Sequence, residues 1–273
     1  MKIIRYLDNT GQIGYGANYN PATGLVEPLA GDFRRGFRRG GRPVKIRKLL
    51  APVAPPAIFC IGLNYRAHAA EFGADRPERP IVFMKNPASI AHPGDPILLP
   101  RSCLNPPQVD YEAELVVVLG QDARNVPAAR AREYIFGYTA GNDVSARHWQ
   151  KHAGGGQWVR GKSFDTFCPL GPQLVSADEI GDPQALAVQC LLNDNLMQDG
   201  TTTDMIFPVT QLIEYLSEDT TLLAGTVIMT GTPAGVGFTR TPPVFLKAGD
   251  QVEIRIDRIG SLRNRVALAP GPA

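Results

Sequence analysis

The sequence has little excess charge of either sign, few cysteines and no long apolar run. Its 273 residues include 28 Lys+Arg and 26 Asp+Glu, giving a formal net charge of +2 at pH 7. Such a balance favours neither a nucleic acid nor an anionic membrane as partner. The most apolar stretches, Leu115–Leu119 and Thr226–Met229, are far too short to cross a bilayer. The four cysteines are widely spaced without a C-x-x-C pair, which predicts reduced, buried thiols rather than a zinc site or disulfides.

The N-terminus also lacks the apolar segment of a secretory signal, since Lys2, Arg5 and Asp8 interrupt it. We therefore expect a cytoplasmic protein. What the chain has instead is 28 Gly and 24 Pro in an otherwise ordinary globular composition with 44% hydrophobic residues. This predicts many turns and short elements, and it argues against a helical bundle.

A proline-rich segment, Ala51–Pro56, suggests a boundary between two parts of the chain. Short alternating runs in residues 1–50 predict a small β-rich N-terminal domain over residues 1–53, followed by a larger domain over 54–273. The run Phe33–Gly41 contains four arginines and two phenylalanines. It could grip nucleic acid, but so short a basic run in a nearly neutral chain is more typical of a surface turn or an interface segment.

Strand-like runs outnumber helical ones in the larger part. The expected strands are Ile58–Ile61, Ile81–Met84, Glu112–Leu119, Ala187–Leu192, Thr226–Thr230 and Gln251–Ile256. The expected helices are Tyr65–Phe72, Val144–His152 and Phe207–Leu216. Because strands and helices do not alternate regularly, the pattern predicts an α+β, mainly β fold rather than a Rossmann fold or a TIM barrel.

Two carboxylates begin the most apolar of these strands. Side chains alternate along a strand, so Glu112 and Glu114 share a face with Val116 and Val118. Two glutamates entering the interior together would repel each other, and a bound hard cation such as Mg²⁺, Mn²⁺ or Ca²⁺ would relieve that repulsion. Alternatively, both lie at a solvated strand end and pair with Arg or Lys. The residues alone leave both possibilities open.

A third carboxylate precedes a helix. Asp143 could simply cap the helix N-terminus. Asp143, Arg147 and Gln150 also fall at i, i+4 and i+7, on one helical face, where they could hold a metal and an anionic ligand. Spacing alone favours the capped helix with a surface ion pair.

Six short strings follow one another along the chain: Ile58–Glu71, Asp110–Leu115, Asn142–Arg147, Gly161–Thr166, Gln198–Thr201 and Thr230–Gly237. In this order they resemble the motifs of the fumarylacetoacetate hydrolase family, in particular its acylpyruvate hydrolase and 2-hydroxyhepta-2,4-diene-1,7-dioate isomerase-like branch. The resemblance runs from about residue 58 to about residue 258, and residues 1–57 carry no motif of the family.

The resemblance implies a mixed β-sandwich or β-roll catalytic domain, usually a homodimer, with Mg²⁺ or Mn²⁺. It implies metal ligation by Glu112, Glu114 and Asp143, an active-site lysine at Lys162, and substrate binding by the residues Arg147, Gln150 and Thr232. His148 stands where many relatives have an acidic residue, which leaves the local charge and the substrate preference open.

The first of these strings contains a candidate general base. His68 and Glu71 lie at i and i+3 of the expected helix Tyr65–Phe72, which Asn64 could cap. A histidine oriented by a carboxylate can accept a proton from water near neutral pH. Spacing alone favours an exposed surface pair, whereas the resemblance implies that both belong to a mobile lid in hydrolytic members.

These parts predict a metal-dependent hydrolase that cleaves a C–C bond in acylpyruvate-type 2,4-dioxo acids such as fumarylpyruvate or acetylpyruvate. Water activated by His68 would attack the distal carbonyl, and Lys162 would help stabilise the enolate of pyruvate that leaves. The alternative is a decarboxylase, tautomerase or isomerase of oxaloacetate or a related 2-oxo diacid that uses the same enolate. The expected partner is therefore a small 2-oxo acid, not a nucleic acid or a membrane.

Overall fold

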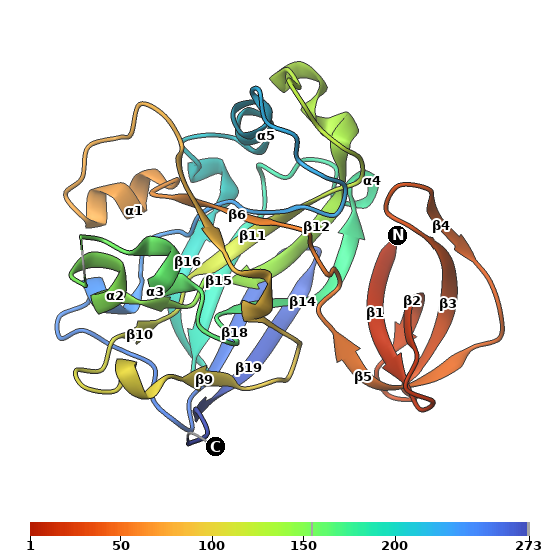
Figure 1. Cartoon of the computed structure of the whole chain (residues 1–273), viewed down its shortest axis with the longest axis horizontal. Helices are drawn as coiled ribbons and strands as arrows, with labels where there is room; N and C mark the ends of the chain where they lie inside the picture. Colours follow the sequence, from red (N-terminus) through yellow and green to blue (C-terminus); the bar gives the residue numbers. More distant parts are fainter. Residues whose placement is uncertain (154, 272–273) are drawn as a thin grey trace.

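The computed structural model describes residues 1–153 and 155–271. A group of N-terminal strands stands beside a larger body that contains the remaining strands and all five α-helices of the described residues (Figure 1). None of these helices is long and apolar enough to span a membrane.

The N-terminal strands form one end of a twelve-stranded sheet. They are β1 (Lys2–Asp8), β2 (Ile13–Asn20), β3 (Leu25–Asp32), β4 (Gly36–Arg39) and β5 (Val44–Leu50). Strand β1 pairs with β2 and β5, and its first residues also pair with β14 of the larger body, Lys2 opposite Val175 and Ile3 opposite Leu174. The sheet is thus continuous across the proline-rich segment, and a domain boundary at residue 53 stays a prediction.

The rest of this sheet crosses the larger body. Its strands follow in the order β14 (Cys168–Ser176), β12 (Ile135–Asn142), β11 (Ala113–Leu119), β17 (Val227–Met229), β6 (Ile58–Gly62) and β7 (Ile81–Lys85). All seven residues of β11 are buried. Leu115 and Val117 join one hydrophobic cluster and Val116 and Val118 another, as expected for a strand covered on both faces.

A second sheet packs against one face of the first. Its order is β16 (Asn195–Thr201), β15 (Ala187–Leu192), β18 (Gln251–Ile256), β19 (Gly260–Leu268) and β9 (Ile97–Leu99). Val188 and Ile254 from this sheet share a core cluster with Leu115 and Val117 of β11. The predicted α+β, mainly β fold is confirmed.

Three short helices gather at one end of the two sheets: α1 (Arg66–Glu71), α2 (Arg147–Lys151) and α3 (Trp158–Lys162) (Figure 1). Helices α4 (Ala177–Ile180) and α5 (Val209–Ser217) lie elsewhere. The remaining elements are strands β8 (Ile90–Ala91), β10 (Val109–Asp110) and β13 (Ser145–Ala146), with 3₁₀ helices at Pro87–Ser89, Arg101–Cys103, Ala128–Tyr134, Thr202–Asp204 and Gly237–Thr239.

The helix expected at Val144–His152 begins only at Arg147. Ser145 and Ala146 instead pair with Asp110 and Val109 in the two-stranded ladder β10–β13. The six expected strands and the other two expected helices are present within two residues of their predicted ends. Several strands, including β12 and β14, were not predicted from the sequence. The glycines, prolines and small residues of these two segments mask the alternating pattern of a strand.

Candidate active site

A cavity of about 220 Å³ lies where α1, α2 and α3 meet the end of the large sheet. It is smaller than the roughly 300–1,000 Å³ typical of sites for drug-sized ligands, so it fits a small substrate. Its wall combines charged groups with an apolar side that includes Phe83 and Trp158. Seven predicted site residues line it: His68, Glu112, Glu114, Arg147, Gln150, Lys162 and Thr232. The remaining two, Glu71 and Asp143, contact His68 and Lys162.

Antiparallel pairing of β11 with β12 brings the three predicted metal ligands together. Ala113 pairs with Asn142, so Glu112 and Asp143, the residues just beyond this pair, are adjacent, and the Asp143 N–H donates to the Glu112 carbonyl at 2.9 Å. Glu112, Glu114 and Asp143 are all buried, and one carboxylate oxygen of each lies within 4.8 Å of the others. Asp143 does not cap the helix, because the residue before α2 is Ala146 and makes no side-chain cap.

Two buried lysines neutralise part of this acidic cluster. The Lys162 ammonium lies 2.8 Å from Glu112 Oε2 and 2.6 Å from Asp143 Oδ2. The Lys85 ammonium lies 2.5 Å from Asp143 Oδ1. Lys85 ends β7, and sequence reasoning missed it because the pairing depends on where β7 lies in the sheet.

A second unforeseen residue, Asp110, fixes the predicted substrate-binding arginine. Arg147 donates from Nε and Nη2 to Asp110 Oδ2 at 2.9 and 2.7 Å, and from Nη1 to Glu112 Oε1 at 2.6 Å. Asp110 also accepts hydrogen bonds from the backbone N–H groups of Gly237 and Phe238. The β10–β13 ladder sets this contact, since Asp110 pairs with the strand that leads directly into α2. In the sequence, only the position of Asp110 near Glu112, in one of the six strings, pointed to a role in the site.

Glu114 is the member of the cluster without a cation partner among the described residues. Its carboxylate accepts a hydrogen bond from the Gly231 N–H at 2.8 Å. Burial and the neighbouring Asp143 and Glu112 carboxylates raise its pKa well above the ordinary value. Burial would also raise the pKa of Glu112, but Lys162 and Arg147 more than offset this and hold that pKa far below its usual range.

The charges of the cluster fit a divalent cation. Four buried carboxylates, those of the three predicted ligands and Asp110, face three buried cations, Lys85, Arg147 and Lys162. With all of them ionised, the cluster retains one negative charge beside Glu114. Oxygen donors select hard ions such as Mg²⁺ or Mn²⁺, and such an ion would leave the site positive overall and suited to an anionic ligand.

His68 and Glu71 form a hydrogen-bonded pair at the cavity. His68 Nδ1 lies 3.0 Å from Glu71 Oε2, and the histidine side chain is only 5% exposed, so His68 is not the exposed residue that spacing alone favours. Burial tends to raise the pKa of Glu71, but hydrogen bonds from His68, Thr239 and the Gly235 N–H lower it below the ordinary value. Because the ionised Glu71 can only accept, Nδ1 carries the proton, and Nε2 is left as a base.

The amide and hydroxyl groups of the cavity are also oriented. Gln150 Oε1 accepts from Arg147 Nη1 at 3.1 Å, which leaves its NH₂ group to donate. Thr232 Oγ1 accepts from Gln198 Nε2 at 2.7 Å, which leaves the Thr232 O–H as a donor. Gln198 Oε1 in turn accepts from the Ala113 N–H at the start of β11. Gln198 lies in one of the six strings, but nothing else in the sequence predicted that it would orient Thr232.

The expected cap of α1 is absent. Asn64 makes no side-chain cap to this helix. It instead donates to the Phe207 and Thr230 carbonyls and accepts from the Phe207 N–H, so it ties the segment before α1 to the rest of the larger body.

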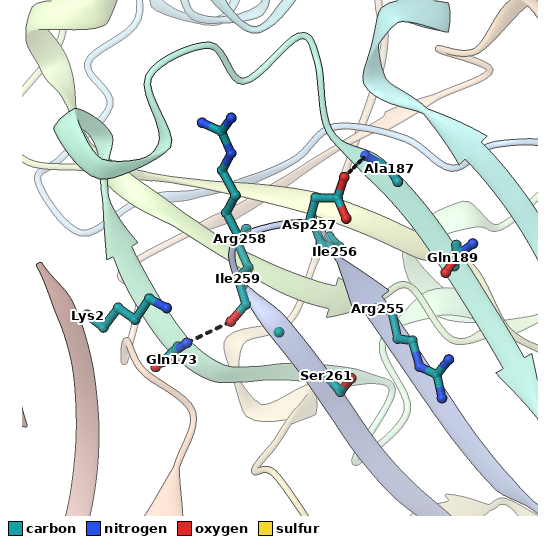
Figure 2. A pocket seen from close by; sticks show the side chains of 11 residues that line it. Lys2, Gln173, Ala187, Gln189, Arg255, Ile256, Asp257, Arg258, Ile259 and Ser261 are labelled. Atoms are coloured by element: carbon teal, nitrogen blue, oxygen red, sulfur yellow. Dashed lines mark hydrogen bonds between the residues drawn. The ribbon is translucent and has the colours of Figure 1, made fainter. Parts of the chain in front are cut away.

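A larger and more open hollow of about 400 Å³ lies between β1, β14 and the second sheet (Figure 2). Three of its polar side chains are occupied with backbone groups. Gln173 donates to the Ile259 carbonyl, Asp257 accepts from the Ala187 N–H, and Arg258 donates to the Ile180 carbonyl. These three side chains thus bind neighbouring backbone segments of the protein.

Comparison with known proteins identifies the family. The description "Fumarylacetoacetate (FAA) hydrolase C-terminal" matches residues 57–267. The chain belongs to the fumarylacetoacetate hydrolase family. Its members are enzymes, and the buried triad Glu112, Glu114 and Asp143 of this chain could bind a metal ion.

The similar proteins include tautomerases and isomerases. The chain is 47% identical over 219 residues to a protein of Xenopus laevis named a mitochondrial oxaloacetate tautomerase, covering 80% of this chain and 68% of the relative. A human mitochondrial oxaloacetate tautomerase is 44% identical over 218 residues, with the same coverage. The solved structure of a 5-carboxymethyl-2-hydroxymuconate delta-isomerase from Mycobacterium smegmatis has a TM-score of 0.84 and 35% identity, covering 98% of this chain and 100% of that one.

Proposed function

We propose that this enzyme transfers a proton at the carbon next to the 2-oxo group of a small 2-oxo acid, and that it interconverts the keto and enol forms of oxaloacetate or a related 2-oxo diacid. The observation that carries the proposal is that the base His68 and the carboxylates Glu112 and Glu114 line one cavity. The names of the relatives support this substrate class. The predicted alternative reaction thus becomes the first candidate.

Glu112, Glu114 and Asp143 would hold Mg²⁺ or Mn²⁺. The ion would supply Lewis-acid polarisation of the 2-oxo oxygen and a fixed anchor for the substrate carboxylate. The Thr232 O–H and the Gln150 NH₂ would donate hydrogen bonds to the same end of the substrate. The Lys162 ammonium would stabilise the negative charge that develops on the 2-oxo oxygen when the neighbouring carbon loses its proton.

His68 would move the proton. With Glu71 holding Nδ1, the lone pair of Nε2 accepts the proton from the carbon next to the 2-oxo group, and the C–H electron pair becomes part of the enolate. A proton from solvent water adds to the enolate oxygen to complete the enol, and His68 then releases its own proton to solvent. In the reverse direction the enol O–H loses its proton to water, and the protonated His68 gives a proton to the carbon. The ionised Glu71 stabilises the imidazolium that forms in between.

Hydrolysis of acylpyruvates is the second candidate. It is favoured by the same dyad, because a histidine held by a carboxylate can equally accept a proton from water that attacks a distal carbonyl. This reaction breaks a C–C bond and yields pyruvate and a second acid.

Two assays on the purified protein test these candidates. We expect Mg²⁺ to accelerate ketonisation of the enol form of oxaloacetate, followed by the loss of enol absorbance, and a chelator to abolish the acceleration. Incubation with acetylpyruvate, followed by NMR, shows whether pyruvate and acetate appear in equal amounts. Equal amounts of both without acceleration of ketonisation would overturn the first candidate in favour of the second. Absence of both activities would overturn both.

A homodimer and a cytoplasmic location remain predictions. Sedimentation of the purified protein tests the first, and imaging of the tagged chain in its own cells tests the second.

A further inference from the structure

Lys151 is a charged residue of the cavity that the mechanism above does not use. It is the last residue of α2, one turn after Arg147, and both side chains line the cavity. Residues at i and i+4 share one face of a helix. The cavity therefore extends past Arg147 to a second cation that lies farther along the helix from the acidic cluster.

Lys151 has no carboxylate partner within the ranges 1–153 and 155–271. The other cations of the cavity wall are already paired, since Arg147 binds Asp110 and Glu112 and Lys162 binds Glu112 and Asp143. The Lys151 ammonium instead lies 4.7 Å from the centre of the Phe72 ring and 3.9 Å from that of Phe238.

Two aromatic rings hold this ammonium in place without neutralising its charge. Phe72 and Phe238 also contact each other, with ring centres 4.9 Å apart, and Arg147 lies 4.3 Å from the centre of the Phe238 ring. Both the paired guanidinium and the unpaired ammonium thus lie against the Phe238 ring. Burial and the Arg147 charge lower the pKa of Lys151, so a second anion beside it would be favourable.

We propose that Lys151 binds the second carboxylate of the substrate and so makes the enzyme selective for 2-oxo diacids over 2-oxo monoacids. This inference rests on the proposed function, which places the 2-oxo acid end at the acidic cluster. The far end of a four-carbon substrate then points along α2 toward the ammonium. Lys151 is a specificity residue in this account and takes no part in proton transfer.

The test compares two ligands that differ only at that end. Oxaloacetate carries a carboxylate where 2-oxobutyrate carries a methyl group. We expect calorimetry with Mg²⁺ present to show that the wild-type protein binds oxaloacetate about tenfold or more tightly than 2-oxobutyrate, as for a charge-assisted hydrogen bond. In Lys151→Met that ratio should fall toward one, with the KM for oxaloacetate raised far more than kcat is lowered. Lys151→Arg should restore most of the preference.

Lys247→Met, which removes an exposed lysine elsewhere on the surface, is the matched control and should keep the wild-type ratio. A wild-type preference that survives in Lys151→Met would overturn the role of Lys151 while leaving the proposed function intact. A wild-type protein that binds both ligands equally would overturn the selectivity itself. Binding of neither ligand by the wild-type protein would overturn the proposed function and this inference together.

Discussion

At the scale of single residues, Glu114 differs from its neighbours in the acidic cluster. Glu112 and Asp143 are paired with lysine or arginine, whereas Glu114 has one backbone N–H as its partner. A buried carboxylate with so little compensation is costly to ionise. We therefore expect Glu114 to contribute more than Glu112 or Asp143 to the binding free energy of a divalent cation.

This assignment predicts how the variant Glu114→Gln behaves. Mg²⁺ at 100 times its dissociation constant should stabilise the wild-type protein by about 2.7 kcal/mol, and the variant should lose most of that gain in thermal unfolding. Glu253→Gln is the control. It removes a buried carboxylate that pairs with Arg255 and Arg263, so it should lower stability but keep the Mg²⁺ gain. An undiminished gain in Glu114→Gln would show that the ion binds elsewhere.

The same residue predicts how the stability of the metal-free protein depends on pH. The folded-state pKa of Glu114 lies above its ordinary value of 4.5. The stability that the protonated group contributes is therefore complete below pH 4.5 and is lost as the pH rises through the raised pKa. Urea unfolding at a series of pH values should show this loss in the wild-type protein and not in Glu114→Gln. Parallel curves for the two proteins would contradict it.

At the scale of elements, Glu71 connects helix α1 to the segment Gly235–Thr239 after β17. Its Oε1 accepts from the Gly235 N–H at 3.0 Å and from the Thr239 hydroxyl at 2.7 Å, while its Oε2 contacts His68. The same carboxylate thus contacts His68 and fixes α1 to the segment after β17.

Thr239→Val should loosen α1. We expect the amide hydrogens of α1 to exchange several-fold faster in this variant than in the wild-type protein near neutral pH. Since the pKa of Glu71 is lowered, its contacts contribute fully above the ordinary value of 4.5 and are lost as the pH falls through the lowered pKa. The difference between variant and wild type should therefore shrink at low pH. Thr220→Val, at an exposed site outside the lid, should not change exchange in α1, and equal exchange in Thr239→Val would refute the connection.

The sequence predicted much of the site but not the contacts that position it. Glu112, Glu114, Asp143 and Lys162 stand in local motifs, so their types and order could be read directly. Lys85 and Asp110 could not, because their partners are 58 and 37 residues away in sequence and meet them only through sheet pairing. The sequence also suggested Asp143 as a possible helix cap. This was wrong because Ser145 and Ala146 form a short strand before the helix, and two residues are too few to show a strand pattern.

At the scale of the whole molecule, an aromatic cluster joins the N-terminal strands to the larger body. Phe33 and Phe37 pack edge-to-face on Phe136 at the start of β12, with ring centres 5.2 and 5.6 Å apart. The arginines between the two phenylalanines are exposed, and Arg34 pairs with Asp122. The basic run of the sequence thus packs within the chain through its phenylalanines and exposes the arginines between them.

Phe136→Ala should weaken this contact. We expect a loss of about 2 kcal/mol in the free energy of unfolding, less than for a fully buried phenylalanine, because Phe136 is half-buried. Amides of β1 to β5 should lose protection before those of β11. Phe245→Ala, also half-buried but outside the cluster, is the control. Equal protection in the variant and wild type would contradict a role for the cluster in docking.

The central claim is that His68 moves the proton on a 2-oxo acid held beside the acidic cluster. The most direct measurement is the Mg²⁺-dependent rate of oxaloacetate ketonisation in His68→Ala, compared with His148→Ala, which removes an exposed histidine of α2. We predict a fall of about 10²–10⁴-fold in kcat for His68→Ala, and a rate near that of the wild type for His148→Ala. A wild-type rate in correctly folded His68→Ala would contradict the account.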